Sequence, residues 1–580
     1  MDAPMPTPCP PPHLPPEQLA LLPPGEDEGP PAPKRAAAAL ADVLRGRRYK
    51  RGLEPSQPML LPPSVEDDIA EDNPARAIGV DVDLMVDVGE LGFKHGAGAG
   101  GAGQPAYDPA DLLKLYLYGY LNRVHSSRRL AAECQRNLEV MWLLKGLQPG
   151  DHTIADFRKD NAKALKAVNR EFMLLCRELG LYGGTRVGLD GSFFNGNASA
   201  GSNKTKQQLE RELAALERDI EHYHEAIDTA DAGEASDPAQ PTLTAEQLAA
   251  LQERAQRRRD QLKVLAETGE TQLSRTDPDA RRLTKNGKQV TGYNVQVVVD
   301  DRHGLILTHE VTNAGNDYGQ LTVMAEQSRQ ALADNAPEGA EVPSPEILAD
   351  GGSFTEAEIA ACEARGLTVY VPLPEKKGSA HAEGRLPGSA FRYDAELDVD
   401  ICPAGRHLAP SGQPAAKNGV LRQRYRSDER DCRACPQRDA YLPEKTPSRQ
   451  IYRSEHADAV DRHRARMAAS PEAMRQRAAL CEHPFGTMKR WLGWDHFLVR
   501  GFEKVRGEMA LLVHCYNFRR LLSLLGVEGF IALCRAHREA GADGDGLGVR
   551  FWVLPGVLER LREAIGALAE CFRQPELAVG

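Results

Sequence analysis

The sequence predicts an α/β protein in which a mixed sheet is flanked by helices and preceded by an all-helical region. Apolar residues recur at helical spacing through 107–181. Between 185 and 372, short apolar runs typical of buried strands alternate with helical segments. A long, charged amphipathic stretch interrupts this second region after Lys206 and indicates an insertion.

Residues 1–57 predict a disordered, proline-rich and basic arm. Residues 1–33 contain 13 prolines, which cannot form hydrogen-bonded ladders or a core. Residues 34–51 add seven basic side chains against one acid, Asp42. This second stretch is either an arm that lies along phosphates or a solvated tail, and the sequence favours neither.

Residues 58–182 predict a helical N-terminal DNA-binding domain. Pro109 opens a stretch with apolar residues at i, i+3, i+4 and i+7. Ser126 and Ser127 can cap a second helix, and Asp151 or Thr153 a third. With 12 basic and 9 acidic side chains, 107–182 is mildly positive within an acidic chain. This charge is a weak indication of DNA binding.

Residues 183–525 predict the α/β domain. A strand from 185 is expected to end in a tight turn at Asp190, and 293–311 reads as a β-hairpin. A helix at 317–333, a strand ending at Asp350, a helix near 355–365 and a strand at 367–372 follow, and helices return at 471–525.

Two insertions and a tail complete this organisation. Leucines spaced by three and four predict a helical hairpin or coiled coil at 206–271. Residues 376–464 are polar, rich in Gly and Pro, and contain cysteines. Residues 526–580 predict a helical C-terminal tail with a flexible linker at 541–548.

The composition limits the classes of function. The chain has 580 residues, 41% of them hydrophobic and 27% charged, so it can build several packed domains. We find neither a membrane-spanning run nor a secretory signal. Eleven scattered cysteines fit free thiols in the cytoplasm. The net charge of −11 argues against a uniformly basic DNA-coating protein, but a local basic face can still bind DNA.

Three carboxylates form the strongest candidate for a chemical site. Asp190 and Asp350 each follow a short apolar run and precede a glycine, and Glu482 lies on a later helix. Carboxylates held together repel one another unless a cation neutralises them, and oxygen-only ligands suit Mg²⁺ or Mn²⁺. Two such ions about 4 Å apart can activate the attacking oxygen and stabilise the leaving oxygen of a phosphoryl transfer. From spacing alone, a metal site and a chance placement of acidic residues are equally open.

The local sequence around these residues closely resembles bacterial insertion-sequence DDE transposases. The resemblance covers about 58–525 and keeps several independent motifs in order. In the α/β region the motifs are Asp190-Gly-Ser-Phe-Phe-Asn-Gly-Asn-Ala-Ser, Gly292-Tyr-Asn-Val-Gln, Ala349-Asp-Gly-Gly-Ser, Glu482-His-Pro-Phe-Gly-Thr-Met-Lys-Arg, Arg500-Gly-Phe-Glu-Lys-Val and Tyr516-Asn-Phe-Arg-Arg. In the helical region they are Ala106-Tyr-Asp-Pro, Ser127-Arg-Arg-Leu and His152-Thr-Ile-Ala-Asp-Phe-Arg.

The resemblance implies an RNase H-like core, Mg²⁺ dependence, and cut-and-paste or related movement of a DNA element. Asp190, Asp350 and Glu482 would be the catalytic and metal-binding residues. The enzyme would hydrolyse a phosphodiester at the element end, and the freed 3′-hydroxyl would then attack target DNA.

Lys489 matches the lysine of the family's tyrosine-arginine-glutamate-lysine signature, which contacts DNA near the cut. It follows Glu482 by seven residues, which is two α-helical turns along one face. The signature's arginine and tyrosine are replaced by Ala478 and Arg475, and Arg477 lies one residue out of phase.

The implied partner is double-stranded DNA, both the terminal inverted repeats of the element and the target. Because two ends must be cut together, we expect a homodimer assembled on DNA. The predicted DNA-contacting residues are Lys489, Arg490, Arg500, Lys504, Arg128, Arg129 and Arg158. Arg519 and Arg520 are further candidates for phosphate contacts.

Cys402, Cys432 and Cys435, with or without His407, are candidates for a structural Zn²⁺ site. A CxxC pair supplies two thiolates, but tetrahedral Zn²⁺ needs four ligands. A zinc site and a vestigial knuckle without metal are equally open.

The sequence leaves two alternatives to a transposase open. The first is an RNase H-like nuclease that cuts DNA without strand transfer. The second is a catalytically inactive, domesticated DNA-binding protein. The intact set of Asp190, Asp350, Glu482 and Lys489 speaks against the second.

Overall fold

The computed structural model describes residues 64–96, 105–231, 245–285, 287–334, 344–374, 386, 388–417, 419–440 and 442–542. The arm predicted at 1–57 and the tail after 542 lie outside these residues. No helix in the described ranges is long and apolar enough to cross a membrane.

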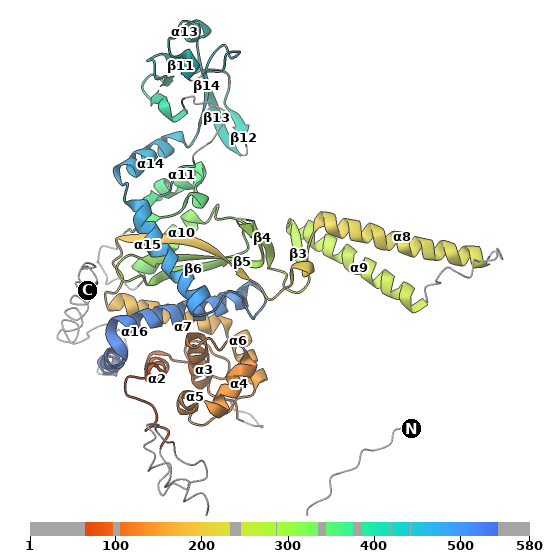
Figure 1. Ribbon diagram of the computed structural model, residues 1–580, viewed down its shortest axis with the longest axis vertical. Coiled ribbons are helices and arrows are strands. Elements are labelled where there is room, and N and C mark those ends of the chain that lie inside the picture. The colour runs from red at the N-terminus through yellow and green to blue at the C-terminus, as the bar shows by residue number, and fades with distance from the viewer. Residues whose placement is uncertain are drawn as a thin grey trace, which may run out of the picture. The chain divides into compact units, whose positions relative to one another are not determined.

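The described N-terminal region is helical, as predicted (Figure 1). Its helices are α2 (Pro74–Met85), α3 (Pro109–Leu121), α4 (Ser127–Arg136), α5 (Leu138–Leu143), α6 (Asp151–Asp160) and α7 (Ala162–Glu178). Asn73 and Asp108 cap α2 and α3 through their side chains, and each is followed by a proline, whose missing N–H costs the first turn nothing. Helix α3 is buried along nearly its whole length and forms the centre of this region.

The α/β region is built on a mixed sheet. Its strands are β1 (Arg186–Asn195), β4 (Arg281–Lys285), β5 (Lys288–Asp300), β6 (Ile306–Thr312), β7 (Glu346–Leu348) and β8 (Val369–Tyr370). The order is β4-β5-β1-β7-β8, and β6 also pairs with β5. The pairs formed by β5 are antiparallel, whereas β1–β7 and β7–β8 are parallel. This confirms the predicted mixed sheet.

The expected strand end at Asp190 was wrong. Strand β1 continues five residues further, with Ser192 paired to Val295 and Asn195 to Gly292 of β5. The Asp-Gly pair suggested a turn, but here the glycine serves close packing within the strand. Asp190 therefore projects from the middle of the longest central strand pair.

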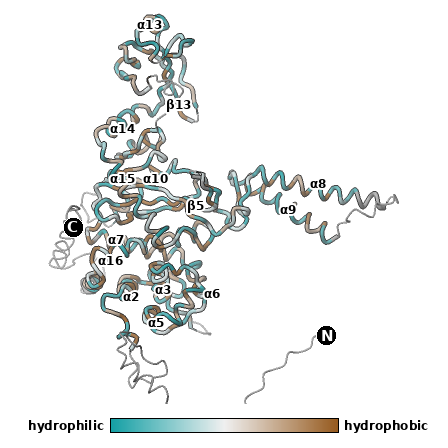
Figure 2. Tube along the Cα trace, in the orientation of Figure 1, coloured by the Kyte–Doolittle hydropathy of each residue, from teal (hydrophilic) through white to brown (hydrophobic). Residues whose placement is uncertain are grey.

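Helices cover the sheet and connect it to the N-terminal region. They are α10 (Leu321–Ala333), α11 (Glu356–Ala364), α14 (Ala457–Ala469), α15 (Ala473–Gly486), a π-helical turn at Thr487–Trp491 and α16 (Phe502–Ala542). Helix α15 packs on β1, and α16 contacts α7, α2 and β6. Helix α16 bends at Gly526, whose φ of 71° is not helical. Hydrophobic residues are frequent along α3, α7 and α16, as Figure 2 shows.

Both interruptions have their own structure. The first is a helical hairpin of α8 (Lys206–Asp231) and α9 (Ala245–Thr268), with β2 (Asn203–Thr205) and β3 (Gln272–Ser274) paired at its base. The second contains an antiparallel sheet that the sequence did not predict. Its strands are β9 (Arg392–Asp394), β10 (Val399–Ile401), β11 (His407–Pro410), β12 (Ala415–Lys417), β13 (Val420–Ser427) and β14 (Gln450–Ser454).

Candidate active site

Asp190 lies on the face of β1 that α15 covers. Side chains alternate along a strand, so Asp190 shares its face with Gly188 and Ser192. A Cβ at Gly188 would lie 2.7 Å from the Cys481 sulfur of α15. Glycine therefore lets the helix approach the strand closely, just before the aspartate.

Asp350 comes to the same place from the neighbouring strand. It follows β7, which runs parallel to β1 with Leu348 opposite Gly188. Its Oδ1 accepts a hydrogen bond from the Gly352 amide at 3.0 Å, which caps the short 3₁₀ turn that follows. Asp190 and Asp350 each lie two residues after this pair, so they face a common space.

Arg477 of α15 joins the two aspartates. Its Nη2 lies 2.5 Å from Asp190 Oδ1 and 3.9 Å from Asp350 Oδ2. Burial alone would lower the pKa of Arg477, but the two carboxylates raise it, so the guanidinium stays charged. The sequence placed this arginine out of phase with the family signature, yet it is the cation that faces both aspartates.

Lys489 lies further along the same face of β1. Its ammonium donates to Ser192 Oγ and to the Phe193 carbonyl, both at 2.6 Å, and lies 4.3 Å from the centre of the Phe194 ring. The predicted signature lysine therefore stands beside the strand that carries Asp190.

Glu482 is not brought into contact with the aspartates. Its side chain is exposed on α15 and makes no hydrogen bond or ion pair with any described residue. Among the residues that the structure describes, no three His, Cys, Asp or Glu side chains are close enough together to hold a metal ion. The geometry thus brings together Asp190, Asp350 and Arg477, whereas Glu482, on the same helix as Arg477, is exposed and stands apart from them.

A buried polar cluster of one carboxylate and two amides, which the sequence did not predict, lies behind Asp190. Asp317 Oδ1 accepts hydrogen bonds from Gln296 Nε2 at 2.6 Å and from Asn294 Nδ2 at 3.0 Å, and all three side chains are buried. A Cβ at Gly352 would lie 3.1 Å from Asp350 Oδ1 and 3.6 Å from Asp317 Oδ2. The signal was present in Gly292-Tyr-Asn-Val-Gln, whose two amides point to this cluster.

The predicted DNA-contacting residues differ in exposure. Arg128, Arg129, Arg490 and Arg500 are exposed, and Lys504 is half-buried. Arg128 pairs with Asp151 at 3.5 Å, and Arg500 donates to the Asn197 carbonyl at 3.0 Å.

The prediction that Arg158 contacts DNA does not fit its buried position. The side chain is only 6% exposed, and its Nη1 lies 3.3 Å from Glu508, which is fully buried. Burial raises the pKa of Glu508, while Arg158 and the amides of Leu498 and Val499 act against this shift. Arg158 therefore serves as the counter-ion of a buried carboxylate between the N-terminal helices and α16.

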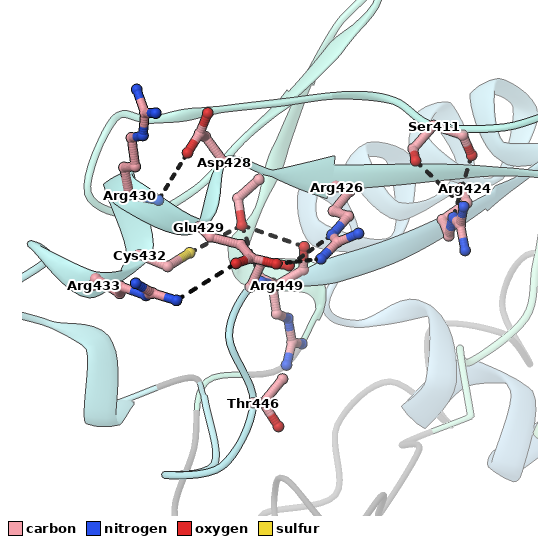
Figure 3. Close-up of polar contacts among 12 residues, drawn as sticks. Ser411, Arg424, Arg426, Asp428, Glu429, Arg430, Cys432, Arg433, Thr446 and Arg449 are labelled. Carbon is pink, nitrogen blue, oxygen red and sulfur yellow. Dashed lines mark hydrogen bonds and ion pairs between the residues drawn. The ribbon is translucent and has the colours of Figure 1, made fainter.

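The cysteine set lies in the second insertion. Cys402, Cys432 and Cys435 line one small cavity of about 10 Å³. Cys432 Sγ lies 2.9 Å from Ser427 Oγ, near Arg426 and Glu429, which form an ion pair at 2.7 Å (Figure 3). His407 is exposed on β11. The three cysteines thus line one cavity, but no three ligands among the described residues are close enough together to hold a metal ion there.

Comparison with protein families finds two matches. Residues 264–518 match the family described as Transposase DDE domain, a range that contains Asp350, Arg477, Glu482 and Lys489. Residues 63–160 match the family described as Transposase domain (DUF772), which coincides with helices α2 to α6. No curated protein and no solved structure matches the chain.

Proposed function

Because the chain is an insertion-sequence DDE transposase, we propose that Asp190, Asp350 and Glu482 are its catalytic carboxylates. The observation that carries this proposal is the convergence of Asp190 and Asp350, from adjacent parallel strands, on the single guanidinium of Arg477. A half-buried cation shared by two acids from adjacent strands indicates a common site. Glu482 is proposed as the third from its position on the helix that covers them.

DDE transposases use divalent metal ions, and the residues present fit such an ion. The donor set consists of carboxylate oxygens, the ligands that Mg²⁺ and Mn²⁺ prefer. The two aspartates already compensate a positive charge, although here it belongs to Arg477. We propose that Mg²⁺ or Mn²⁺ is held by Asp190 and Asp350, with Glu482 turning inward and Arg477 releasing at least one carboxylate. When bound, the ion supplies charge stabilisation for the attacked phosphate.

The proposed reaction proceeds in two phosphoryl transfers. In the first, water attacks the phosphorus at the element end, the bond to the 3′ oxygen breaks, and that oxygen takes up a proton. In the second, the 3′-hydroxyl attacks a phosphodiester of the target, forming one phosphorus–oxygen bond as another breaks. The chain contributes position and charge: Lys489 and Arg477 place cations on either side of Asp190, and such fixed charge lowers the barrier without covalent catalysis.

We propose that the sheet is an RNase H-like core. The path β6-β5-β1-β7-β8, with antiparallel pairs on one side of β1 and parallel pairs on the other, supports this. We assign 58–182 to DNA recognition, 183–525 to the catalytic domain with insertions 206–271 and 376–464, and 526–580 to a tail.

The proposed partners are the terminal inverted repeats and the target, both double-stranded. The proposed DNA contacts are Arg128, Arg129, Lys489, Arg490, Arg500 and Lys504, on the basis of their positive charge and, apart from Lys489 and Lys504, their exposure. We propose that two copies assemble on paired ends, and that the protein works in the cytoplasm at the nucleoid.

The test is cleavage and joining of an element-end duplex with Mg²⁺ or Mn²⁺. Asp190→Asn, Asp350→Asn and Glu482→Gln preserve shape and remove one charge each. We expect each variant to bind the duplex and to lose cleavage by about a hundred- to a thousandfold, the range found when one group that stabilises the transition state is removed. Glu528→Gln, an exposed carboxylate on α16, is the matched control.

The outcomes separate the alternatives. Full activity of Glu482→Gln would place the third carboxylate elsewhere. Cleavage without joined products would favour a nuclease without strand transfer. Binding without cleavage by the unaltered chain would favour the domesticated DNA-binding protein.

A further inference from the structure

A polar pocket lies between α16 on one side and α15 with the π-helical turn that follows it on the other. Its volume is about 310 Å³. It is lined by His483, Gly486, Thr487, Trp491, Tyr516, Arg519, Arg520 and Ser523. Part of this lining comes from α15 and the π-helical turn, and the rest comes from α16. The first part runs from His483, the neighbour of Glu482, to Trp491, two residues after Lys489.

Two arginines, Arg519 and Arg520, line this pocket, Arg123 lies beside its Trp491, and none of its lining residues is acidic. The guanidinium of Arg519 lies over the Trp491 ring and makes no hydrogen bond or ion pair with any described residue. The Arg123 guanidinium lies 5.8 Å from the centre of the same ring and donates to the carbonyls of Arg490 and Trp491. Arg520 donates to the His303 carbonyl.

This arrangement is unfavourable unless an anion enters. Arg519 is half-buried, and burial followed by the charge of Arg123 lowers its pKa. Like charges that share a partly desolvated site repel, and a charge-assisted hydrogen bond to an anionic oxygen would relieve both costs. The pocket is therefore suited to an anion.

The occupant is better described as a phosphate than as an unstacked base. Trp491 is 44% exposed, which would otherwise suit base stacking. However, Arg519 already covers its ring, so an incoming base would have to displace a cation–π contact. A phosphate needs no such displacement, because it binds the outward donors of the guanidinium.

We propose that this pocket holds one backbone phosphate of the DNA strand that runs past the candidate active site. The inference rests on the proposed function and names the part of the DNA held at this position. Arg519 is the principal ligand, Trp491 fixes its plane, and Arg123 and Arg520 add positive charge. The pocket would hold the DNA strand between α15 and α16, while Lys489 contacts β1, the strand that carries Asp190.

The test is a scan of an element-end duplex in which one phosphate at a time is replaced by an uncharged methylphosphonate. Binding is measured by fluorescence anisotropy for the unaltered chain, Arg519→Ala and Ser523→Asp. Ser523 lines the pocket, is exposed, and donates to the Arg519 carbonyl at 3.0 Å, so an aspartate there would pair with Arg519 and exclude phosphate. The matched controls are Arg535→Ala, an exposed arginine of α16 outside the pocket, and Ser523→Ala.

One methylphosphonate position should weaken binding of the unaltered chain by about tenfold, the usual effect of losing one charge-assisted hydrogen bond. Arg519→Ala and Ser523→Asp should bind the native duplex about tenfold less tightly, and the methylphosphonate at that position should not weaken their binding further. The slope of their log affinity against log salt concentration should fall in magnitude by roughly one unit. Both controls should keep the original pattern.

If Arg519→Ala and Ser523→Asp keep the original pattern while the unaltered chain still cuts the duplex, the pocket inference is overturned and the proposed function stands. If the unaltered chain neither binds nor cuts, the proposed function itself fails. Because Ser523→Asp adds a charge on an exposed helix position, it tests the pocket even if Arg519→Ala unfolds.

Discussion

Gly191 and Gly351 each follow a candidate metal-binding aspartate, but the structure gives them opposite tolerance for a methyl group. A Cβ at Gly191 would overlap the Gln296 amide nitrogen and Asp317 Oδ1, with Gln296 Cδ at 2.9 Å. A Cβ at Gly351 would meet the Pro372 carbonyl at 3.6 Å and nothing nearer, which is ordinary contact. Neither glycine has a positive φ, so space alone decides.

The magnitude for Gly191→Ala follows from what the methyl group displaces. Overpacking a buried site costs about 1–3 kcal/mol. Separating Gln296 and Asn294 from Asp317 breaks two hydrogen bonds to a charged acceptor, each contributing about 1.5–3 kcal/mol. We expect a loss of at least about 4 kcal/mol, a large part of the roughly 5–15 kcal/mol that stabilises a domain. Gly351→Ala should change stability by no more than about 0.5 kcal/mol.

The assay is urea unfolding of both variants and the unaltered chain, followed by circular dichroism, with the midpoint of the transition of the α/β region as the readout. The two alanine variants introduce the same atom, so the comparison isolates the surroundings. Equal midpoints for the two variants would refute the reasoning, because they would mean that the Asn294-Gln296-Asp317 cluster yields without cost.

Three further predictions concern packing and charge. Glu508→Ala should destabilise the chain by about 3–5 kcal/mol in urea unfolding, because it leaves the buried Arg158 charge without its partner; an unchanged midpoint would mean that water reaches Arg158. Gly507→Ala should lower the melting temperature strongly, since its Cβ would lie 2.6 Å from the backbone of Ala162 in α7. Gly529→Ala, whose nearest contact is 3.4 Å away, should be neutral or stabilising. Similar melting temperatures for the two variants would contradict the close approach of α16 and α7. Burial lowers the pKa of His309 to about 4, so as the pH falls the unfolded chain takes up a proton at this residue before the folded chain does. The contribution of neutral His309 to stability should therefore be full above about pH 6.5 and be lost as the pH drops toward 4. His309→Gln should flatten this part of the pH profile of stability measured by thermal unfolding. A profile of His309→Gln that matches the unaltered chain would assign the pH dependence to other groups.

The parts of the fold that the sequence predicted are those in which local pattern and tertiary packing agree. The leucines of α8 and α9 recur at helical spacing because one stripe of each helix packs on the other; Leu209 and Ala255 are fully buried. The strands around Val295 and Ile347 read as continuous apolar runs because both of their faces are covered. The sheet of the second insertion was missed because its strands are short and mostly polar, with exposed residues such as Leu421 and Tyr452, so neither alternation nor an apolar run marks them.

Of the cluster around Asp190, the sequence could predict the two aspartates, because they lie on neighbouring strands. Asp190 and Asp350 follow apolar runs that proved to be adjacent and parallel, so sequence order was enough to bring them together. Arg477 was not predictable as their partner, since its role depends on how closely α15 approaches β1 over Gly188.

The same helix shows why residue spacing could not settle the third carboxylate. Seven residues separate Glu482 from Lys489, and in an uninterrupted α-helix this spacing would place both on one face. The chain from Thr487 to Trp491 is instead π-helical, so each residue there turns through a smaller angle and the relation between the two positions changes. Lys489 is directed at Ser192, whereas Glu482 is exposed. The proposed inward turn of Glu482 is therefore a step that the seven-residue spacing could not predict, because that spacing spans a backbone irregularity that a count of residues does not reveal.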